Sequence, residues 1–331
     1  MTMKPFAHAH ASSVEEAVAA MDEGCRPLAG GTDLLGMMKA GLVSPQRLVN
    51  LKTIPGLDQI VLGDDGTHIG ALTVLARLAG DPAVNGRPEV ACLVEAIVQS
   101  ASPQLRHMAT VGGNLLQRPR CWYYRNRLVP CWRKGGQTCF AFRGENKYHV
   151  ILGGGPCHAA HPSDPAVALL ALDARVVVAG PAGARSFPLG ELYRLPSREE
   201  RNDTVLAWNE LITEVIIPPP PGGSCGTYVK VAERAAWDFG LASVAAQVSL
   251  VEGIVQGVRI ALGGVAPIPW RATDAEQALV GHRLTAQTLD EAARAASAGA
   301  RPLAHNGYKV RLLQGVVRQA LAKLAAEQGR A

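Results

Sequence analysis

Four of the seven cysteines in this 331-residue chain stand in one segment, and their residue type is the first feature that could do chemistry. They are Cys121, Cys131, Cys139 and Cys157. A chain of this length needs no disulfides to fold, so clustered cysteines indicate a metal site or catalysis. The spacing contains no Cys-x2-Cys pair, so it matches neither a zinc ribbon nor a ferredoxin motif.

The residues around these cysteines are basic and aromatic. Positions 117–150 hold eight Lys and Arg residues against one acidic residue, and seven of the sixteen aromatic residues. Unrelated buried thiols would stand in apolar sequence, so that interpretation is disfavoured. Because four thiolates carry negative charge, the basic residues suit either a structural zinc or an iron–sulfur cluster, and both alternatives stay open. Nucleic acid is not expected, because the aromatic residues alternate with cysteines and lack the regular spacing of base-stacking positions.

Two glycine-rich segments have the character of anion-binding loops. The first is "PLAGGTDLLGMMK", with Gly30 and Gly31 between a strand and a helix, and the second is "ATVGGNLLQ". Adjacent glycines let successive backbone N–H groups point at one anion, and the next helix adds its positive end. Neither segment matches a Walker loop or a dinucleotide fingerprint. For each of the two segments, an ordinary tight turn and part of a pyrophosphate site therefore both stay open as interpretations.

Composition and patterning indicate an α+β protein with a local basic patch. Hydrophobic residues make up 48% of the chain and charged residues 18%, which is ordinary for a globular protein. The net charge of +5 comes almost wholly from the cysteine segment, which argues against general nucleic-acid or membrane binding. No signal peptide and no apolar run of membrane-spanning length is evident. We expect no membrane span and a cytoplasmic location, unless a partner carries an export signal.

The segment "TEVIIPPPPGG" is the clearest domain boundary, because four prolines and two glycines follow a strand pattern. We expect a first domain over residues 1–220, with subdomains at about 1–55 and 56–220, and a second domain over 224–331. Residues 227–265 alternate like a three-stranded antiparallel sheet. Helices are expected at about 273–300 and 306–328.

Five segments in one order resemble a known family. They are "PLAGGTDLLGMMK", "SPQLRHMATVGGNLLQ", "HPSD", "YVKVAERAAWDFGLASVAA" and "LGGVAPIPWRA". Together they are similar to the FAD-binding medium subunit of the xanthine dehydrogenase (molybdenum hydroxylase) family, from the N-terminus to the last helix. The resemblance implies a two-part, PCMH-like FAD-binding domain and a smaller α+β C-terminal domain of the CO dehydrogenase flavoprotein type.

The chain departs from most of that family at one point. The Ser-Asp pair usually follows the second glycine loop closely, whereas Asp164 here lies 50 residues after Asn114. The cysteine segment, about 117–160, fills the gap. This resembles the FAD subunits of three-subunit, periplasmic-type aldehyde oxidoreductases and of 4-hydroxybenzoyl-CoA reductase, which carry a [4Fe–4S] cluster there. The resemblance implies that the four cysteines are cluster ligands, and it favours iron–sulfur over zinc.

The resemblance also implies the FAD contacts. The first loop should wrap the pyrophosphate with backbone amides, and the second loop should form the opposite wall. Asp164 should meet the ribose or adenine end, while Ile212 and Lys230 should lie against the isoalloxazine ring. The full set of expected FAD residues is Pro27, Leu28, Ala29, Gly30, Gly31, Thr32, Asp33, Leu34, Leu35, Thr110, Gly113, Asn114, Asp164, Ile212 and Lys230.

The implied function is electron transfer within an aldehyde oxidoreductase. A large molybdenum-cofactor subunit would oxidise the substrate, a small [2Fe–2S] subunit would relay electrons, and FAD in this chain would pass them to an acceptor. No catalytic residue is expected in the chain itself. Two alternatives are a reductase subunit acting on an aromatic acyl-CoA, and a zinc-stapled module that binds a nucleotide without redox work. With an exported partner, the compartment would be the periplasm.

Overall fold

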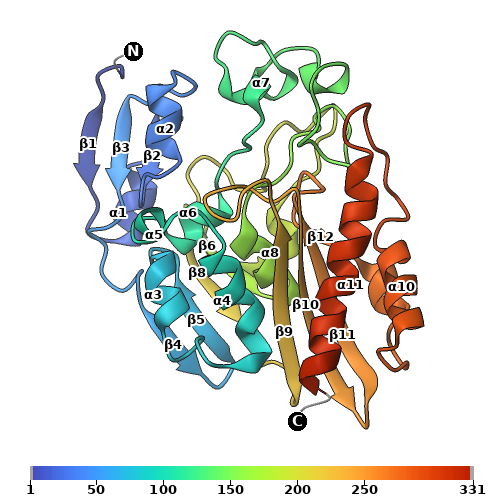
Figure 1. Ribbon diagram of the computed structural model, residues 1–331. Helices are drawn as coiled ribbons and strands as arrows, with labels where there is room; N and C mark the ends of the chain where they lie inside the picture. Colours follow the sequence, from blue (N-terminus) through green and yellow to red (C-terminus); the bar gives the residue numbers. More distant parts are fainter. Residues whose placement is uncertain (1–2, 329–331) are drawn as a thin grey trace.

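The computed structural model describes residues 3–328, which form three β-sheets with helices between and beside them (Figure 1). The first sheet is parallel, with strand order β1-β3-β2. Ser13 caps the first helix by accepting a hydrogen bond from the Glu16 amide at 3.1 Å. The elements are β1 (Ala7–His10), α1 (Val14–Ala19), β2 (Cys25–Leu28), α2 (Leu34–Lys39) and β3 (Arg47–Asn50). The first glycine loop thus joins the end of β2 to α2.

The second sheet is antiparallel, with strand order β4-β5-β8-β6-β7. Its strands are β4 (Ile60–Gly63), β5 (Gly66–Gly70), β6 (Arg175–Gly180), β7 (Gly183–Pro188) and β8 (Leu211–Ile217). The helices around it are α3 (Leu75–Gly80), α4 (Ala91–Val98), α5 (Pro103–Arg106), α6 (Val111–Leu115) and α8 (Asp164–Ala171), with 3-10 turns at Pro88–Val90 and Leu189–Leu192. Helices α6 and α8 pack in the same core, and the cysteine segment is inserted between them in the sequence.

The cysteine segment has little regular structure and lies at the top of the molecule in Figure 1. Its elements are the short helix α7 (Trp122–Arg125) and 3-10 turns at Trp132–Lys134 and Phe140–Phe142. Gly and Pro residues recur through the segment, which disfavours longer helices.

The third sheet has strand order β12-β11-β10-β9, and all its pairs are antiparallel. The predicted three-stranded sheet is confirmed, and a two-residue edge strand extends it. The elements are β9 (Ser224–Val231), β10 (Ala242–Val251), β11 (Ile254–Gly263), β12 (Trp270–Arg271), α9 (Thr273–Gln277), α10 (Ala286–Ala295) and α11 (Tyr308–Gln328). No helix among residues 3–328 is both long and apolar enough to cross a bilayer.

Alternation along β10 buries both faces of this third sheet. Val244 belongs to a core shared with α11, whereas its neighbour Ala245 belongs to the core that α4 and α8 share with the second sheet. Side chains of adjacent strand residues point to opposite faces, which explains the near-continuous apolar run. The proline linker lies between β8 and β9, but the division into two domains there stays a prediction, because one core continues across it.

Candidate cofactor site

Both glycine loops open onto one cavity of about 500 Å³, which we call the loop cavity. Most of the residues predicted to hold FAD lie on its wall. These are Pro27, Leu28, Ala29, Gly30, Gly31, Thr32, Asp33, Leu34, Thr110, Gly113 and Ile212. Leu35 is not among the lining residues. Gly112, Gln117, Arg118 and Tyr124 also line this cavity and were not predicted.

Close backbone approach explains the glycines of the first loop. A Cβ on Gly30 would lie 1.8 Å from the backbone oxygen of Met108, just before the second loop. Gly31 has φ of +72°, a left-handed conformation that favours glycine. The two loops therefore come together only because these positions carry no side chain.

The second loop begins a short helix, α6. Thr110 is its N-cap, and its hydroxyl accepts a hydrogen bond from the Gly113 amide at 3.2 Å. A Cβ on Gly112 would lie 3.0 Å from the Cβ of Ala71, so the second glycine of the pair permits close packing on the second sheet. The close packing at Gly112 could have been predicted, because the Gly-Gly pair is visible in the sequence.

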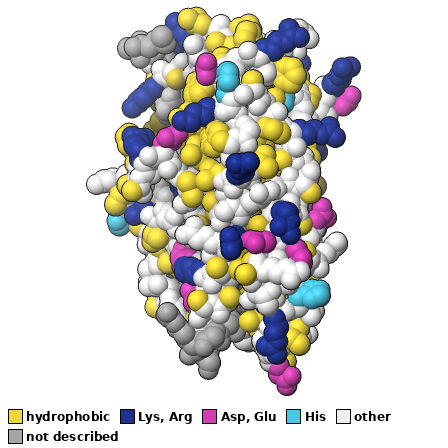
Figure 2. All heavy atoms as spheres, turned by 45° about the vertical axis from the view of Figure 1, so that its right-hand side comes forward, with side chains coloured by type: hydrophobic (Ala, Val, Ile, Leu, Met, Phe, Trp, Pro, Cys, Tyr) yellow, Lys and Arg dark blue, Asp and Glu magenta, His cyan; other side chains and the backbone are white. Residues whose placement is uncertain are grey.

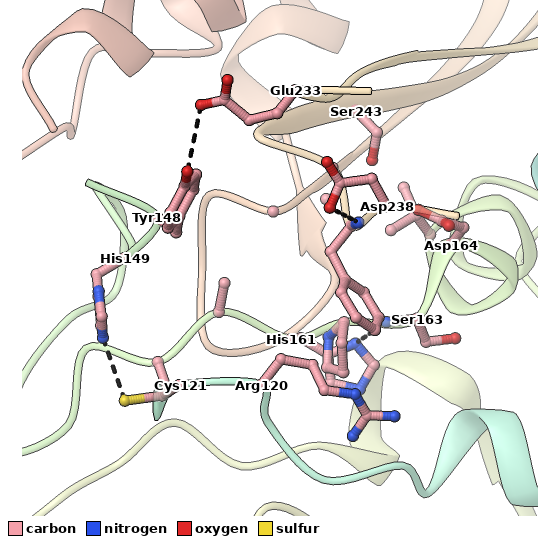
Figure 3. Close-up of a pocket in the computed structure, with 18 of the residues that line it drawn as sticks. Arg120, Cys121, Tyr148, His149, His161, Ser163, Asp164, Glu233, Asp238 and Ser243 are labelled. Atoms are coloured by element: carbon pink, nitrogen blue, oxygen red, sulfur yellow. Dashed lines mark hydrogen bonds between the residues drawn. The ribbon is translucent and has the colours of Figure 1, made fainter. Parts of the chain in front are cut away.

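A second cavity of about 440 Å³, the Asp164 cavity, lies between the cysteine segment and the third sheet (Figure 3). It is lined by Arg120, Cys121, Trp122, Tyr148, His149, Ala159, Ala160, His161, Pro162, Ser163, Asp164, Val167, Glu233, Arg234, Asp238, Phe239, Gly240, Ser243, Gly263 and Gly264. Burial holds the pKa of His161 down to about 4, so this imidazole is neutral at physiological pH.

A hydrogen bond joins the second glycine loop to the Ser-Asp pair, although Asn114 itself lines neither cavity. The Ser163 hydroxyl donates to Asn114 Oδ1 at 2.5 Å, and it also accepts from the Ala166 amide at 3.0 Å as the N-cap of α8. The second glycine loop and the Ser-Asp pair therefore meet in space, although the cysteine segment separates them in sequence.

Asp164 is held by three buried donors. Its carboxylate accepts from Tyr228 OH at 2.6 Å, Lys230 Nζ at 2.8 Å and Ser100 Oγ at 3.0 Å. Burial first, and then the Asp164 carboxylate, raises the pKa of Tyr228 well above its usual value, so this hydroxyl stays a donor. Asp164 is 8% exposed, so its charge is compensated within the protein.

Ile212 and Lys230 lie in different places. Ile212 is on β8 and lines the loop cavity, whereas Lys230 is on β9 and lines neither cavity. The Lys230 side chain is 5% exposed, and its ammonium also donates to the Gln99 carbonyl at 3.0 Å. The Lys230 charge is therefore neutralised by Asp164, and the lysine lies in a third recess outside both cavities. That both residues touch one flavin ring stays a prediction.

The four cysteines gather beside the Asp164 cavity. Cys121 packs on one side against a cluster that contains Cys131, and on the other against a cluster that contains Cys157. Cys121 Sγ lies 3.2 Å from His149 Nε2, and Arg133 Nε donates to Cys157 Sγ at 3.3 Å. The Arg133 side chain is 2% exposed and ion-paired with Asp203, which gives the thiols a buried cation.

Within the described residues, the cysteine segment does not present a preformed site for a single metal ion. Among residues 3–328, no three Cys, His, Asp or Glu side chains lie close enough to hold one metal ion. Tetrahedral zinc at about 2.3 Å from each sulfur requires sulfurs about 3.8 Å apart, whereas the ligands of a four-iron cluster stand farther apart. Burial raises the pKa of Cys121 to about 12, so this thiol is protonated at neutral pH.

A buried lysine lies behind the Asp164 cavity. Lys309 of α11 is 0% exposed, and its Nζ donates to the carbonyls of Gly264 at 2.8 Å and Tyr148 at 3.2 Å. Burial lowers its pKa to about 7. The two carbonyl acceptors match the two N–H bonds of a neutral amine.

This lysine makes stability depend on pH. The folded chain releases the Lys309 proton near pH 7, whereas the unfolded chain holds it to about pH 10. The unfolded state therefore binds more protons between these values, and stability rises with pH there by at most about 1.4 kcal/mol per unit. We expect the slope of melting temperature against pH to be smaller in Lys309→Met. An equal slope in both proteins would contradict the neutral-amine assignment.

The fold and these cavities indicate the class of the protein: an α+β protein with a candidate cofactor cavity between two glycine loops. Comparison with known proteins then specifies the cofactor. Residues 4–220 match the FAD binding domain in molybdopterin dehydrogenase, and residues 227–324 match the CO dehydrogenase flavoprotein C-terminal domain. The chain therefore belongs to the FAD-binding medium subunits of the molybdenum hydroxylase family.

Individual relatives are similar to this chain over nearly its full length. The aldehyde oxidoreductase FAD-binding subunit PaoB of Escherichia coli (strain K12) is 38% identical over 98% of this chain and 100% of its own length. The carbon monoxide dehydrogenase medium chain of Afipia carboxidovorans is 27% identical over 97% of each. Carbon monoxide dehydrogenase from Hydrogenophaga pseudoflava aligns with a TM-score of 0.77 at 28% identity, covering 99% of both chains.

These findings confirm several of the predictions made from the sequence. The family, the α+β fold, FAD as cofactor and the assignment as an oxidoreductase subunit are all borne out. The [4Fe–4S] cluster, the individual FAD contacts and the composition of the complex stay predictions.

Proposed function

We propose that this chain is the FAD- and [4Fe–4S]-binding electron-transfer subunit of a molybdenum-containing aldehyde oxidoreductase. The observation that carries the proposal is the position of Cys121, which lines the Asp164 cavity and packs against both clusters that hold other segment cysteines. A metal group on these thiols would stand beside the cofactor site. Similarity to PaoB over 98% of this chain supports the aldehyde oxidoreductase branch.

FAD, when bound, accepts electrons singly and passes them on singly or in pairs. The residues of this chain bind and orient it. Amides of the first and second glycine loops would hold the diphosphate in the loop cavity, and α6 would add its positive end. The Asp164 cavity, with Phe239, Pro162 and neutral His161 on its wall, offers an apolar place for a flat ring. Asp164, Ile212 and Lys230 remain the predicted contacts beyond the loops.

Cys121, Cys131, Cys139 and Cys157 would hold the cluster, which supplies one-electron transfer when bound. Arg133 donates to Cys157 and places a buried positive charge next to the thiols. Such a charge compensates the negative charge of a four-thiolate cluster and favours its reduced form. The [4Fe–4S] group is preferred over zinc because the relatives are subunits of oxidoreductases, in which a redox-active group has a role that zinc cannot fill.

The proposed partners are a large molybdenum-cofactor subunit and a small [2Fe–2S] subunit. The cysteine segment exposes aromatic side chains, among them Phe142 at 55% and Tyr148 at 42%. On the face in Figure 2, hydrophobic side chains gather in the upper half with Lys and Arg side chains around them. Mixed aromatic and basic surfaces of this kind are typical of subunit contacts. The compartment, cytoplasm or periplasm with an exported partner, stays a prediction.

The substrate class separates the proposal from its nearest alternative, a reductase subunit acting on an aromatic acyl-CoA. The assembled complex is mixed anaerobically with an aldehyde or with an aromatic acyl-CoA, and flavin absorbance near 450 nm is followed. We expect the aldehyde to bleach the flavin and the acyl-CoA to leave it oxidised. Reoxidation of pre-reduced enzyme by the acyl-CoA, with no response to aldehydes, would support the reductase instead.

A further inference from the structure

The charge balance of the loop cavity depends on the cysteine segment. The charged side chains on its wall are Arg26, Asp33, Arg118 and Glu210. Glu210 is already paired with Arg185 at 3.0 Å. Asp33 precedes α2 directly, next to the glycine pair where a diphosphate would bind. An uncompensated carboxylate there would repel an anionic ligand, because like charges in a partly buried site are poorly screened.

Three arginines that follow the second glycine loop enclose Asp33. Arg120 donates to Asp33 Oδ1 at 2.7 Å, and Arg125 donates to the same oxygen at 2.9 Å. The Arg118 amide donates to Asp33 Oδ2 at 2.8 Å. The exposed fractions are 17% for the Asp33 side chain, 28% for Arg120 and 22% for Arg125. Two guanidinium groups on one carboxylate leave a net positive charge at this wall.

Arg120 also spans the two cavities. It lines the Asp164 cavity, yet its guanidinium bonds to Asp33 and to Gln117 Oε1, at 3.1 Å, which both line the loop cavity. Its guanidinium carbon lies 5.2 Å from the centre of the Phe239 ring, which also lines the Asp164 cavity. In Figure 3, Arg120 lies beside His161, and both residues line the Asp164 cavity. A cofactor extending through both cavities would pass this cation.

We propose that the cysteine segment is part of the FAD site: Arg120 and Arg125 neutralise Asp33 and so allow the loop cavity to accept the cofactor's diphosphate. This rests on the FAD site proposed above, but not on the identity of the metal group. It reassigns Asp33 from a direct cofactor contact to the anchor of these arginines. Arg120 and Arg125 are positioning residues. Without them, the uncompensated Asp33 carboxylate would repel the FAD diphosphate.

The test is a double-mutant cycle on FAD affinity in the purified full-length chain. FAD release on dilution is followed by flavin fluorescence for Arg120→Met, Asp33→Asn and the double variant. We expect Arg120→Met to weaken FAD binding by about tenfold or more, and Asp33→Asn to change it by less than about threefold. The double variant should bind better than Arg120→Met alone, because no carboxylate is left uncompensated.

Controls separate charge from folding. Arg127→Met removes the same charge from an exposed position of the same segment and should leave FAD affinity unchanged. Arg120→Lys keeps the charge and should restore most of the affinity, which a purely structural role of the side chain would not allow. If Arg120→Met does not fold, Arg125→Met replaces it in the cycle with the same expected pattern.

Three results would overturn the proposal. They are an unchanged FAD affinity in Arg120→Met and Arg125→Met, a tenfold loss in Asp33→Asn alone, or an undiminished effect of Arg120→Met in the Asp33→Asn background. Iron and sulfide are counted in each variant. Normal FAD affinity together with loss of the metal group is one form of the first result, and it leaves the proposed electron-transfer function standing.

Discussion

Cys131→Ala should lose its iron and acid-labile sulfide while retaining FAD. Cys131 is 6% exposed and packs with Met37 and Tyr124, so no other side chain on that side replaces the thiolate. A [4Fe–4S] cluster requires four ligands, and we expect iron to fall from about four per chain to near zero. FAD should remain because neither cavity is lined by Cys131.

Cys92→Ala is the matched control. Cys92 is 0% exposed in α4 and outside the segment, so it tests the loss of a buried thiol alone. This variant should keep full iron, sulfide and FAD, and lose only about 1 kcal/mol of stability. A full iron and sulfide count in Cys131→Ala, or an equal loss in Cys92→Ala, would show that Cys131 is not a cluster ligand.

Gly30→Ala should weaken FAD binding strongly. The added methyl group would lie 1.8 Å from the Met108 backbone oxygen, so the first loop must move away from the second. Forcing such a contact costs about 1–3 kcal/mol, equivalent to about 5- to 150-fold in affinity if the strain is borne by the FAD-bound arrangement. FAD affinity by fluorescence and the free energy of unfolding by denaturant titration measure the two effects.

Gly36→Ala provides the comparison six residues further on. Gly36 is exposed on α2 and nothing lies within 4 Å of its added Cβ. Alanine should stabilise this helix by about 0.5–1 kcal/mol and leave FAD affinity unchanged. If Gly30→Ala binds FAD as tightly as Gly36→Ala does, the two glycine loops do not form the cofactor site.

The sequence predicted the backbone part of the site better than the side-chain part. The two Gly-Gly pairs indicate close backbone approach, and both indeed line the loop cavity. β12 was not predicted, because the two residues that follow Pro267 and Pro269 are too few to carry a periodic pattern. Leu35 was included by continuity with the loop, but it lies outside the cavity wall.

Ion pairs between distant residues were beyond prediction. Lys230 looked like an exposed strand lysine or a flavin contact, and only the folded chain brings Asp164 to it. Asp33 likewise looked like part of a phosphate loop, while its partners Arg120 and Arg125 seemed to belong to the cysteines alone. Such pairing depends on tertiary approach across about 90 residues of sequence, for which local propensity gives no information.

Metal and flavin content of the purified chain tests the central claim most directly. FAD, iron, acid-labile sulfide and zinc are counted in one preparation, and electron paramagnetic resonance is recorded after anaerobic reduction. We expect about one FAD with about four iron and four sulfide per chain, and a cluster signal in the reduced sample. Stoichiometric zinc without iron, or FAD with neither metal, would contradict an electron-transfer cluster in the cysteine segment.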